Sequence, residues 1–331
     1  MNILFPSRNN KRSVEIFTED SAGNTVINGK RFNKLYAKMD RSFIKDFLEE
    51  NKIFSGYEDK ISENMVNKID NKKTVIMGIL NATPDSFYAG SRILDKSRID
   101  SMLDEKPDII DIGGESTRPG SLPVPPDIET ERIRPVIDYI KSVSNIPVSI
   151  DSRNYDTIKA VISMDIDYIN DISGFSDERM IKIACDYNVR AIVMHMIGTP
   201  QTMQNFTEYD DIIFEINNFF YSRINKMLKF GIKPENIIVD PGIGFSKDTN
   251  GNITILRSPW SFFLGFDTLF GTSRKRFIGT LTGSDVNDRL GGTIGTSIYL
   301  SENGVDILRV HDPAQNRDAI NVFRKLTSID E

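Results

Sequence analysis

The sequence has few of the residues that build disulfides, zinc sites and thiol active sites. Its 331 residues include one cysteine, Cys185, and two histidines, His195 and His311. A single cysteine cannot form an internal disulfide, so we expect a reducing compartment and interpret Cys185 as a buried structural thiol. Its position inside an expected helix argues against a Cys–His dyad. A zinc site of both histidines and Asp240 is conceivable, but the spacing matches no usual zinc motif.

Long apolar runs and excess positive charge are also missing. No run approaches the ~20 apolar residues of a membrane span, and residues 1–8 lack the apolar core of a signal peptide. The net charge of -6 argues against a general nucleic-acid or anionic-membrane surface, although a local basic pocket remains possible. We therefore expect a cytoplasmic protein that binds neither nucleic acid nor membranes.

The sequence instead repeats one pattern eight times: an apolar strand, a polar cluster and a helix. The strands are expected at residues 74–80, 108–112, 147–150, 168–169, 190–194, 236–239, 268–270 and 305–308. The helices are expected at residues 94–103, 127–143, 155–164, 177–187, 210–230, 252–263, 286–303 and 314–326.

Eight alternations over roughly 260 residues predict an α/β fold of the (β/α)8 TIM barrel type. Strands that are apolar on both faces fit a parallel sheet covered by helices. The alternative is an open doubly wound sheet, which usually carries a glycine-rich dinucleotide turn after an early strand, and no such turn is present. We expect the barrel to span residues 74–331.

Residues 1–73 do not follow the pattern and are interpreted as an N-terminal extension and linker. Two short strands are expected at residues 13–17 and 25–28, joined by a turn at 21–24. Apolar residues at roughly helical spacing predict a helix over 31–51, and the polar stretch 60–73 is interpreted as the linker. This hairpin-plus-helix extension is expected to pack against the barrel or a second subunit.

The polar clusters of a barrel meet at the carboxyl end of its strands. That end would collect Asn81, Thr117, Arg118, Asp151, Asn170, His195, Asp240, Lys275, Arg309 and His311. Asp151, Asn170 and Asp240 offer acceptors and an amide, which suit a flat heterocycle rich in N–H donors and ring nitrogens. Each could alternatively be a helix cap or a turn residue.

A second group of side chains is cationic. Arg118 and Arg309 offer forked donors that match phosphate oxygens, and His311 lies beside Arg309 in sequence. The alternative, a set of surface arginines, is disfavoured because Arg309 follows an apolar strand. Asn81 could supply an oxygen ligand to Mg²⁺ near such a phosphate.

Two further residues are open to two interpretations. Lys275 lies in a basic turn at residues 273–276. In one interpretation it contacts the heterocycle or an acidic co-substrate, and in the other it is a solvated surface charge. Phe245 follows a loop shaped by Gly242 and Gly244, and it is either a stacking platform or a core residue.

Eight motifs, in order, resemble those of dihydropteroate synthases. They occupy residues 77–87 (MGILNATPDSF), 111–120 (DIGGESTRPG), 149–151, 170–174, 194–204, 240–245, 271–275 and 309–312. The resemblance covers about residues 74–331 and leaves residues 1–70 outside. It implies a cytoplasmic folate-biosynthesis transferase that condenses 7,8-dihydropterin-6-ylmethyl diphosphate with 4-aminobenzoate to give 7,8-dihydropteroate and pyrophosphate.

The resemblance also implies roles for individual residues. Pterin binding would fall to Asp151, Asn170, Met194, Asp240 and Lys275. Pyrophosphate and Mg²⁺ would be held by Asn81, Arg118, Arg309 and His311. The aminobenzoate pocket would be lined by Thr117, Pro119, Phe245 and Arg276, and the catalytic residues would be Asp151, Lys275, Arg309 and His311. Members of this family commonly form homodimers through barrel helices.

Two positions depart from the family pattern. Residues 86–90 read Ser-Phe-Tyr-Ala-Gly, so Ala89 stands where the family usually has an aspartate. Arg276 stands where a serine usually contacts the aminobenzoate carboxylate, and it could bind that carboxylate more strongly or fill the pocket. The alternative function is therefore a pterin-binding barrel with a changed acceptor or no activity. A folate-dependent methyltransferase would need neither residues 309–311 nor the Ser-Arg-Lys turn. A non-catalytic role of the extension is a third possibility.

Overall fold

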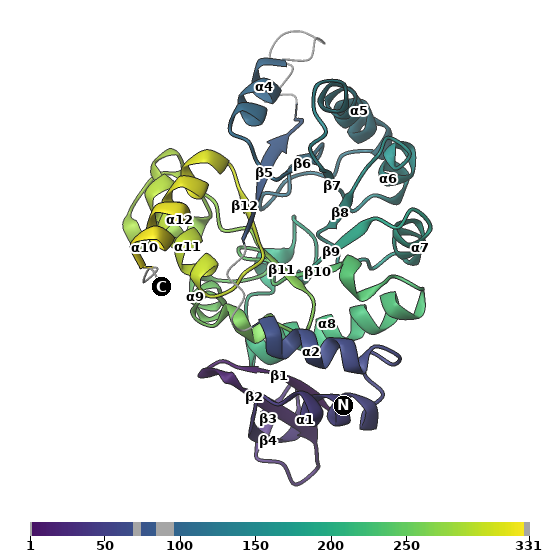
Figure 1. Ribbon diagram of the computed structural model, residues 1–331, viewed down its shortest axis with the longest axis vertical. Helices are drawn as coiled ribbons and strands as arrows, with labels where there is room; N and C mark the ends of the chain where they lie inside the picture. Colours follow the sequence, from purple (N-terminus) through teal and green to yellow (C-terminus); the bar gives the residue numbers. More distant parts are fainter. Residues whose placement is uncertain (1, 69–73, 84–95, 328–331) are drawn as a thin grey trace.

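The main body of the computed structural model is a closed barrel of parallel strands, with residues 2–68, 74–83 and 96–327 of the chain described. The strands follow one another around the barrel in chain order, and the last pairs with the first (Figure 1). They are β5 (Val75–Asn81), β6 (Ile109–Gly113), β7 (Val148–Asp151), β8 (Tyr168–Asp171), β9 (Arg190–Met194), β10 (Ile237–Asp240), β11 (Asp267–Phe270) and β12 (Ile307–Val310). The predicted (β/α)8 TIM barrel is confirmed.

Helices surround the barrel, and the expected ones are present with modest differences (Figure 1). They are α4 (Lys96–Asp104), α5 (Pro126–Val143), α6 (Tyr155–Val161), α7 (Glu178–Asp186), α8 (Ile212–Lys229), α9 (Thr249–Arg257), α10 (Arg276–Thr282), α11 (Leu290–Glu302) and α12 (Pro313–Thr327). The helix expected at 252–263 ends at Arg257 and is followed by the 3₁₀ turn η3 (Pro259–Phe262), because proline disrupts an α-helix. Helix α10 was not expected. Among the described residues, no helix is both long and apolar enough to cross a membrane.

The barrel interior is filled at the amino end of its strands. A cluster of inward-facing apolar side chains occupies this level: Met77, Ile109, Ile192, Ile238, Leu269 and Ile307. Apolar residues on the outer face of the strands pack with the helices into a larger core. Because these side chains fill the amino half of the barrel interior, the described residues leave the carboxyl end of the strands for a ligand site.

The extension is a four-stranded antiparallel sheet followed by two helices. Its strands are β1 (Ile3–Ser7), β2 (Asn10–Glu19), β3 (Thr25–Ile27) and β4 (Lys30–Lys38), in the order β1-β2-β4-β3, and its helices are α1 (Arg41–Glu50) and α2 (Glu58–Lys68). Two of the predictions made for this region are wrong. Residues 31–38 form a strand rather than a helix, and residues 60–68 form most of α2 rather than a linker. Residues 69–73 lie outside the described part.

The expected hairpin pairing is also wrong, because β2 and β3 both pair with β4. The tight turn joins β3 to β4 through Asn28 and Gly29, whose φ angles of 50° and 74° suit a two-residue hairpin. The chain becomes helical only after Asp40, whose carboxylate accepts a hydrogen bond from the backbone N–H of Phe43 at 3.0 Å and caps α1.

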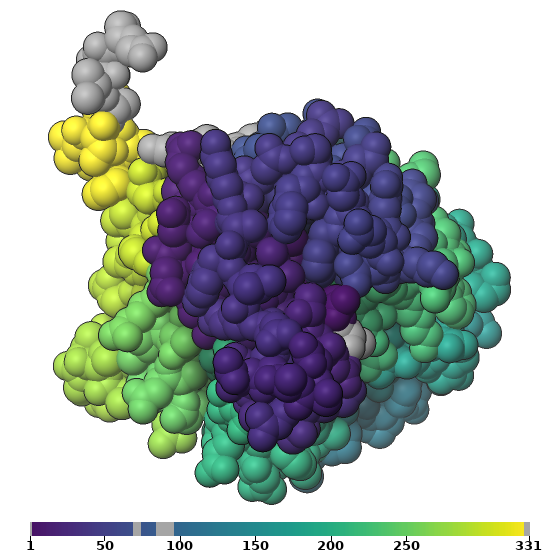
Figure 2. Space-filling model, turned by 90° about the horizontal axis from the view of Figure 1, so that it is seen from below, coloured from purple at the N-terminus to yellow at the C-terminus, as the bar shows by residue number. Residues whose placement is uncertain are grey.

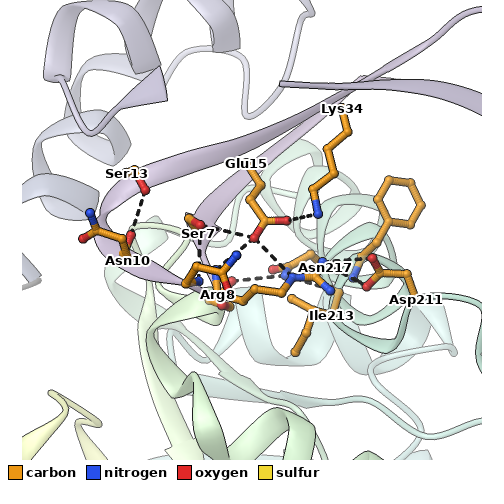
Figure 3. A network of polar contacts seen from close by, with 12 residues as sticks. Ser7, Arg8, Asn10, Ser13, Glu15, Lys34, Asp211, Ile213 and Asn217 are labelled. Atoms are coloured by element: carbon orange, nitrogen blue, oxygen red, sulfur yellow. Dashed lines mark hydrogen bonds and ion pairs between the residues drawn. The ribbon is translucent and has the colours of Figure 1, made fainter. Parts of the chain in front are cut away.

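A polar network fastens the sheet to the flank of the barrel (Figure 3). The buried Glu15 carboxylate accepts a hydrogen bond from Arg8 at 3.2 Å and forms an ion pair with Lys34 at 2.8 Å. Arg8 also donates to Asp211, the N-cap of α8, at 2.9 Å. The Trp260 indole donates to the carbonyl of Ser7 at 2.9 Å. Seen from below, the extension covers much of the molecule (Figure 2).

Helix α2 crosses the amino end of the barrel, opposite the carboxyl ends of the strands. The buried Lys68 ammonium donates to the carbonyl of Phe266 at 2.7 Å and forms an ion pair with Asp306. Asn64 donates to the carbonyl of Gly265 at 3.0 Å. Phe266 and Asp306 directly precede β11 and β12, so the extension supports the amino end of the barrel.

Candidate active site

A cavity of about 1090 Å³ opens at the carboxyl ends of the strands. Every residue that the sequence analysis assigned to substrate or metal lines it: Asn81, Thr117, Arg118, Pro119, Asp151, Asn170, Met194, Asp240, Phe245, Lys275, Arg276, Arg309 and His311. The exception among the strand-end residues is His195, which is 3% exposed and does not line the cavity. Ala89 and residues 84–87 of the first motif lie outside the described residues.

Arg309 is the centre of a buried charge network at the floor of the cavity. Its Nε donates to Asp111 Oδ2 at 2.5 Å, and its Nη2 donates to Asp151 Oδ2 at 2.6 Å. Asn170 Nδ2 donates to the same Asp111 oxygen at 3.1 Å. The guanidinium therefore pairs with two carboxylates, from β6 and β7, offsets only part of their combined charge, and still has donor capacity on its outer nitrogens.

Among the described residues, three buried oxygens of this network have no hydrogen-bond partner: Oδ1 of Asp111, Oδ1 of Asp151 and Oδ1 of Asn170. Buried acceptors are normally paired, so these atoms indicate a ligand that brings its own donors. Burial raises the pKa of Asp151 to about 7, an effect that the positive charge of Arg309 opposes. Burial also raises the pKa of Asp240 to about 6, against a hydrogen bond of 2.8 Å from the backbone N–H of Gly242.

Lys275 and Phe245 form the opposite wall. The Lys275 ammonium lies 4.2 Å from the centre of the Phe245 ring, an arrangement in which the ring face attracts the cation. Burial lowers the pKa of Lys275 to about 8, and the nearby charge of Arg309 contributes to the same shift. Phe245 also packs with the apolar side chains of Ile172, Met194 and Met203. Phe245 thus lines the cavity and belongs to an apolar cluster.

His311 is held in one orientation by Ser273. The backbone N–H of His311 donates to Ser273 Oγ at 3.2 Å, and the same hydroxyl lies 2.9 Å from His311 Nδ1. Because this hydroxyl already accepts from the backbone, its hydrogen is available for Nδ1, which leaves the imidazole proton on Nε2. Burial, followed by the charges of Arg309 and Arg274, lowers the pKa of His311 to about 4. His311 is therefore a neutral imidazole with an N–H donor at Nε2.

The described residues contain no group of three histidine, cysteine, aspartate or glutamate side chains that could bind a metal. The conceivable zinc site is therefore not supported, and His195 Nδ1 instead lies 3.1 Å from Lys247 Nζ. Asn81 contributes one neutral amide oxygen to the cavity. Such a donor set fits Mg²⁺ only as a complex with phosphate oxygens and water, which is the usual manner of magnesium binding.

Several residues at this end of the barrel were not expected from the sequence. Asp111 was taken as part of an apolar strand, although an acid within such a strand is itself a signal that one face is polar. Lys247 and Arg289 also line the cavity, and Ser273 orients His311. Cys185, interpreted as a buried thiol, is half-buried on α7, and its Sγ lies 3.3 Å from the carbonyl of Phe230.

Comparison with known proteins decides the family. Residues 77–311 match the family model described as pterin binding enzyme. The chain belongs to the pterin-binding enzyme family. A dihydropteroate synthase of Synechocystis sp. is 41% identical over 248 residues, which cover 73% of this chain and 86% of that protein. The dihydropteroate synthase of Escherichia coli is 34% identical over 263 residues, which cover 77% of this chain and 93% of that protein.

Solved structures give the same family. A Clostridium difficile dihydropteroate synthase crystallised in the presence of pteroic acid has a TM-score of 0.71 at 38% identity, covering 78% of this chain and 98% of that one. The Thermus thermophilus enzyme in complex with 4-aminobenzoate has a TM-score of 0.70 at 35% identity, covering 77% and 95%. The family match begins at residue 77 and so leaves the extension outside.

Proposed function

We propose that this protein is a dihydropteroate synthase of folate biosynthesis. It condenses 7,8-dihydropterin-6-ylmethyl diphosphate with 4-aminobenzoate and releases pyrophosphate. The proposal rests on three groups of side chains that line one cavity. They are the buried acceptors of Asp151 and Asn170 that have no partner among the described residues, Lys275 on the Phe245 ring, and the cationic group that includes Arg118 and Arg309. The names of the family members that it resembles support the same reaction.

The pterin lies in the deep part of the cavity. Asp151, Asn170 and Asp240 accept hydrogen bonds from its amino group and ring N–H groups, because their buried oxygens can be satisfied only by donors. Met194 packs on one face of the ring, and Lys275 contacts the ring from the Phe245 side. Burial raises the pKa values of Asp151 and Asp240, and bound donors and any positive charge on the pterin favour their ionised forms.

The diphosphate lies towards Arg118, Arg309 and His311. Arginine forks match phosphate oxygens, and the Nε2–H of His311 adds a neutral donor. We propose that Mg²⁺ binds with the diphosphate and takes the amide oxygen of Asn81 as a ligand. When bound, the ion would neutralise charge on the leaving group.

Catalysis then depends on charge stabilisation and on orientation. Pyrophosphate departs first, and Arg118, Arg309 and His311 stabilise the negative charge that develops on it. Asp151 stabilises the cationic pterin that remains. The amino group of 4-aminobenzoate is a weak nucleophile, so its alignment by Thr117, Pro119, Phe245 and Arg276 contributes much of the rate.

The protein is also proposed to be a cytoplasmic homodimer. Its single cysteine supports a reducing compartment. Neighbouring helices α11 and α12 expose apolar side chains, among them Tyr299 at 41%, Val322 at 60% and Leu326 at 80%. Apolar side chains that form a contiguous exposed patch are typical of association surfaces, and these helices supply side chains for such a patch. Sedimentation of the wild type and of Val322→Asp tests the dimer, since the charge should produce monomers.

Product formation is the decisive experiment. Purified protein, Mg²⁺, the pterin diphosphate and 4-aminobenzoate should yield dihydropteroate, measured by chromatography. Lys275→Ala should abolish the product, and chelation of the metal should reduce it. If no product forms while the pterin diphosphate still binds, the alternative of a changed acceptor or lost reaction applies, and other arylamines should be tested. The alternative is based on Arg276, which stands where the family usually has a serine that contacts the aminobenzoate carboxylate.

A further inference from the structure

Lys247 is a buried lysine whose ammonium is used entirely inside the protein. It is 3% exposed, and it lies in the loop that joins β10, which ends at Asp240, to α9. Its Nζ donates to the carbonyl of Phe245 at 2.8 Å and to the carbonyl of His195 at 3.4 Å, and it lies 3.1 Å from His195 Nδ1. An ammonium has three protons, so these acceptors occupy its full donor capacity.

The position is costly for a charged group. Burial lowers the pKa of Lys247 to about 7, and no carboxylate of the described residues forms an ion pair with it. His195 must accept through Nδ1, which requires a neutral ring, and burial together with the Lys247 charge holds the pKa of His195 well below its ordinary value. Proteins rarely retain such a group for stability alone, because an apolar side chain of similar shape is often as stable or more so.

The loop that Lys247 holds has an unusual backbone. Gly242, Gly244 and Ser246 have φ angles of 69°, 83° and 47°, in the left-handed region that glycine tolerates and serine does not favour. A Cβ on Gly242 would lie 2.1 Å from the carbonyl oxygen of His195, so the loop sits directly on the end of β9. Lys247 joins the two segments at this contact.

The loop in turn places the pterin wall. Phe245, whose carbonyl accepts from Lys247, carries the ring under the Lys275 ammonium. A Cβ on Gly244 would lie 3.2 Å from Lys275 Cδ, so the loop backbone also fixes the stem of that lysine. Asp240, at the start of the loop, accepts the backbone N–H of His195 through its carbonyl at 2.9 Å.

We propose that Lys247 is a positioning residue of the pterin site, which ties the β10–α9 loop to the end of β9 and so sets where Phe245, Lys275 and Asp240 meet the pterin. Its saturated ammonium has no donor left for the ligand. This inference rests on the proposed function. Lys247 has no proposed role in binding pyrophosphate. Its hydrogen bonds go to Phe245 and His195 and not to the pyrophosphate ligand Arg309 on β12.

The test compares Lys247→Met with the wild type in two calorimetric titrations. The first uses 6-hydroxymethyl-7,8-dihydropterin, which lacks the diphosphate, and the second uses inorganic pyrophosphate with Mg²⁺. We expect pterin affinity to fall about 10- to 100-fold, as for loss of several bonds to a charged donor. Pyrophosphate affinity should change less than threefold, and the melting temperature should stay the same or rise. Lys229→Met, on the exposed face of α8, is the matched control.

A second variant guards against misfolding of the first. His195→Gln keeps an acceptor for Lys247 and should retain pterin affinity within about threefold, whereas His195→Leu should weaken it and add little further loss to Lys247→Met. Unchanged pterin affinity in Lys247→Met, or a parallel loss of pterin affinity, pyrophosphate affinity and melting temperature, would overturn the inference. If the wild type itself fails to bind the pterin, the proposed function fails and the inference falls with it.

Discussion

Replacing Asp151 by asparagine should stabilise the empty protein and at the same time weaken its binding of pterin. Asp151 is 8% exposed, lies at the end of β7 and has one unpaired oxygen. Burial is the main reason that its pKa is raised from 3.8 to about 7. The folded protein therefore holds a proton between these two pH values that the unfolded chain releases, so stability falls as the pH rises through this window.

The size of the effect follows from that rise in pKa. At about 1.4 kcal/mol for each pKa unit, the raised pKa of Asp151 costs the folded state up to about 4 kcal/mol at pH 8, where the carboxylate is ionised, and up to about 2 kcal/mol at pH 5, where it must take up a proton. Asparagine keeps an oxygen acceptor for Arg309 and removes the charge. The melting temperature of Asp151→Asn should then exceed that of the wild type by several degrees at pH 8, at roughly 2 °C per kcal/mol, and by less at pH 5.

Thermal melts of Asp151→Asn and the wild type at pH 5 and pH 8 measure the difference in melting temperature. The control is Asp138→Asn, on the exposed face of α5. Calorimetry with 6-hydroxymethyl-7,8-dihydropterin should show at least tenfold weaker binding, because a charge-assisted hydrogen bond is lost. Equal gains at pH 5 and pH 8, or a lower melting temperature at pH 8, would refute the argument that the buried charge is costly.

Three further substitutions test other parts of the molecule. Arg309→Met should reduce pyrophosphate affinity more than 100-fold in calorimetry and destabilise the fold, since two buried carboxylates lose their cation. Arg276→Ser should change the affinity for the aminobenzoate substrate and for a sulfonamide inhibitor, both measured by steady-state kinetics, without changing pterin affinity; unchanged affinity for both would refute the role. Lys68→Met should cost about 3 kcal/mol or more and lower the melting temperature, while kcat per folded molecule is retained, because α2 lies at the opposite end of the barrel. Loss of kcat in a folded Lys68→Met variant would contradict the expectation that α2 does not affect the active site.

The barrel and its strand-end residues were predictable from sequence because both depend on local patterns. Each parallel strand is buried on both faces and forms an apolar run, and the residue that follows it lies at the carboxyl end of the barrel by topology alone. Asn81, Asp151 and Asp240 could therefore be assigned to one site without knowing any contact. His195 shows the limit of the rule, since its side chain turns away from the cavity towards Lys247.

The extension was predicted poorly because its residues are placed by distant partners. Leu35 and Tyr36 are exposed on β4 at 57% and 56%, and their spacing imitates an apolar helix face. The Asn28-Gly29 turn was an available signal of a hairpin. Lys68 ends a polar helix, and nothing near it in sequence reveals that Asp306 is its partner. Asp111 was missed because its partners Arg309 and Asn170 come from other strands, and Lys247 was missed because His195, which it contacts, lies 52 positions earlier in the sequence.

The docking of the extension also has a consequence for the order of folding. The sheet of the extension is built from strands that are close in sequence, so it can form early. The hydrogen bonds that attach the extension to the barrel instead join Arg8, Leu4 and Lys68 to residues that lie 203, 217 and 238 positions away in the sequence, respectively. Contacts of such high sequence separation are slow to form, because a long loop must close first. Lys68 finds Asp306 only when the segment before the last strand is in place. We therefore expect α2 to dock late, after the barrel is complete, and the proteolytic resistance of α2 to appear last in refolding.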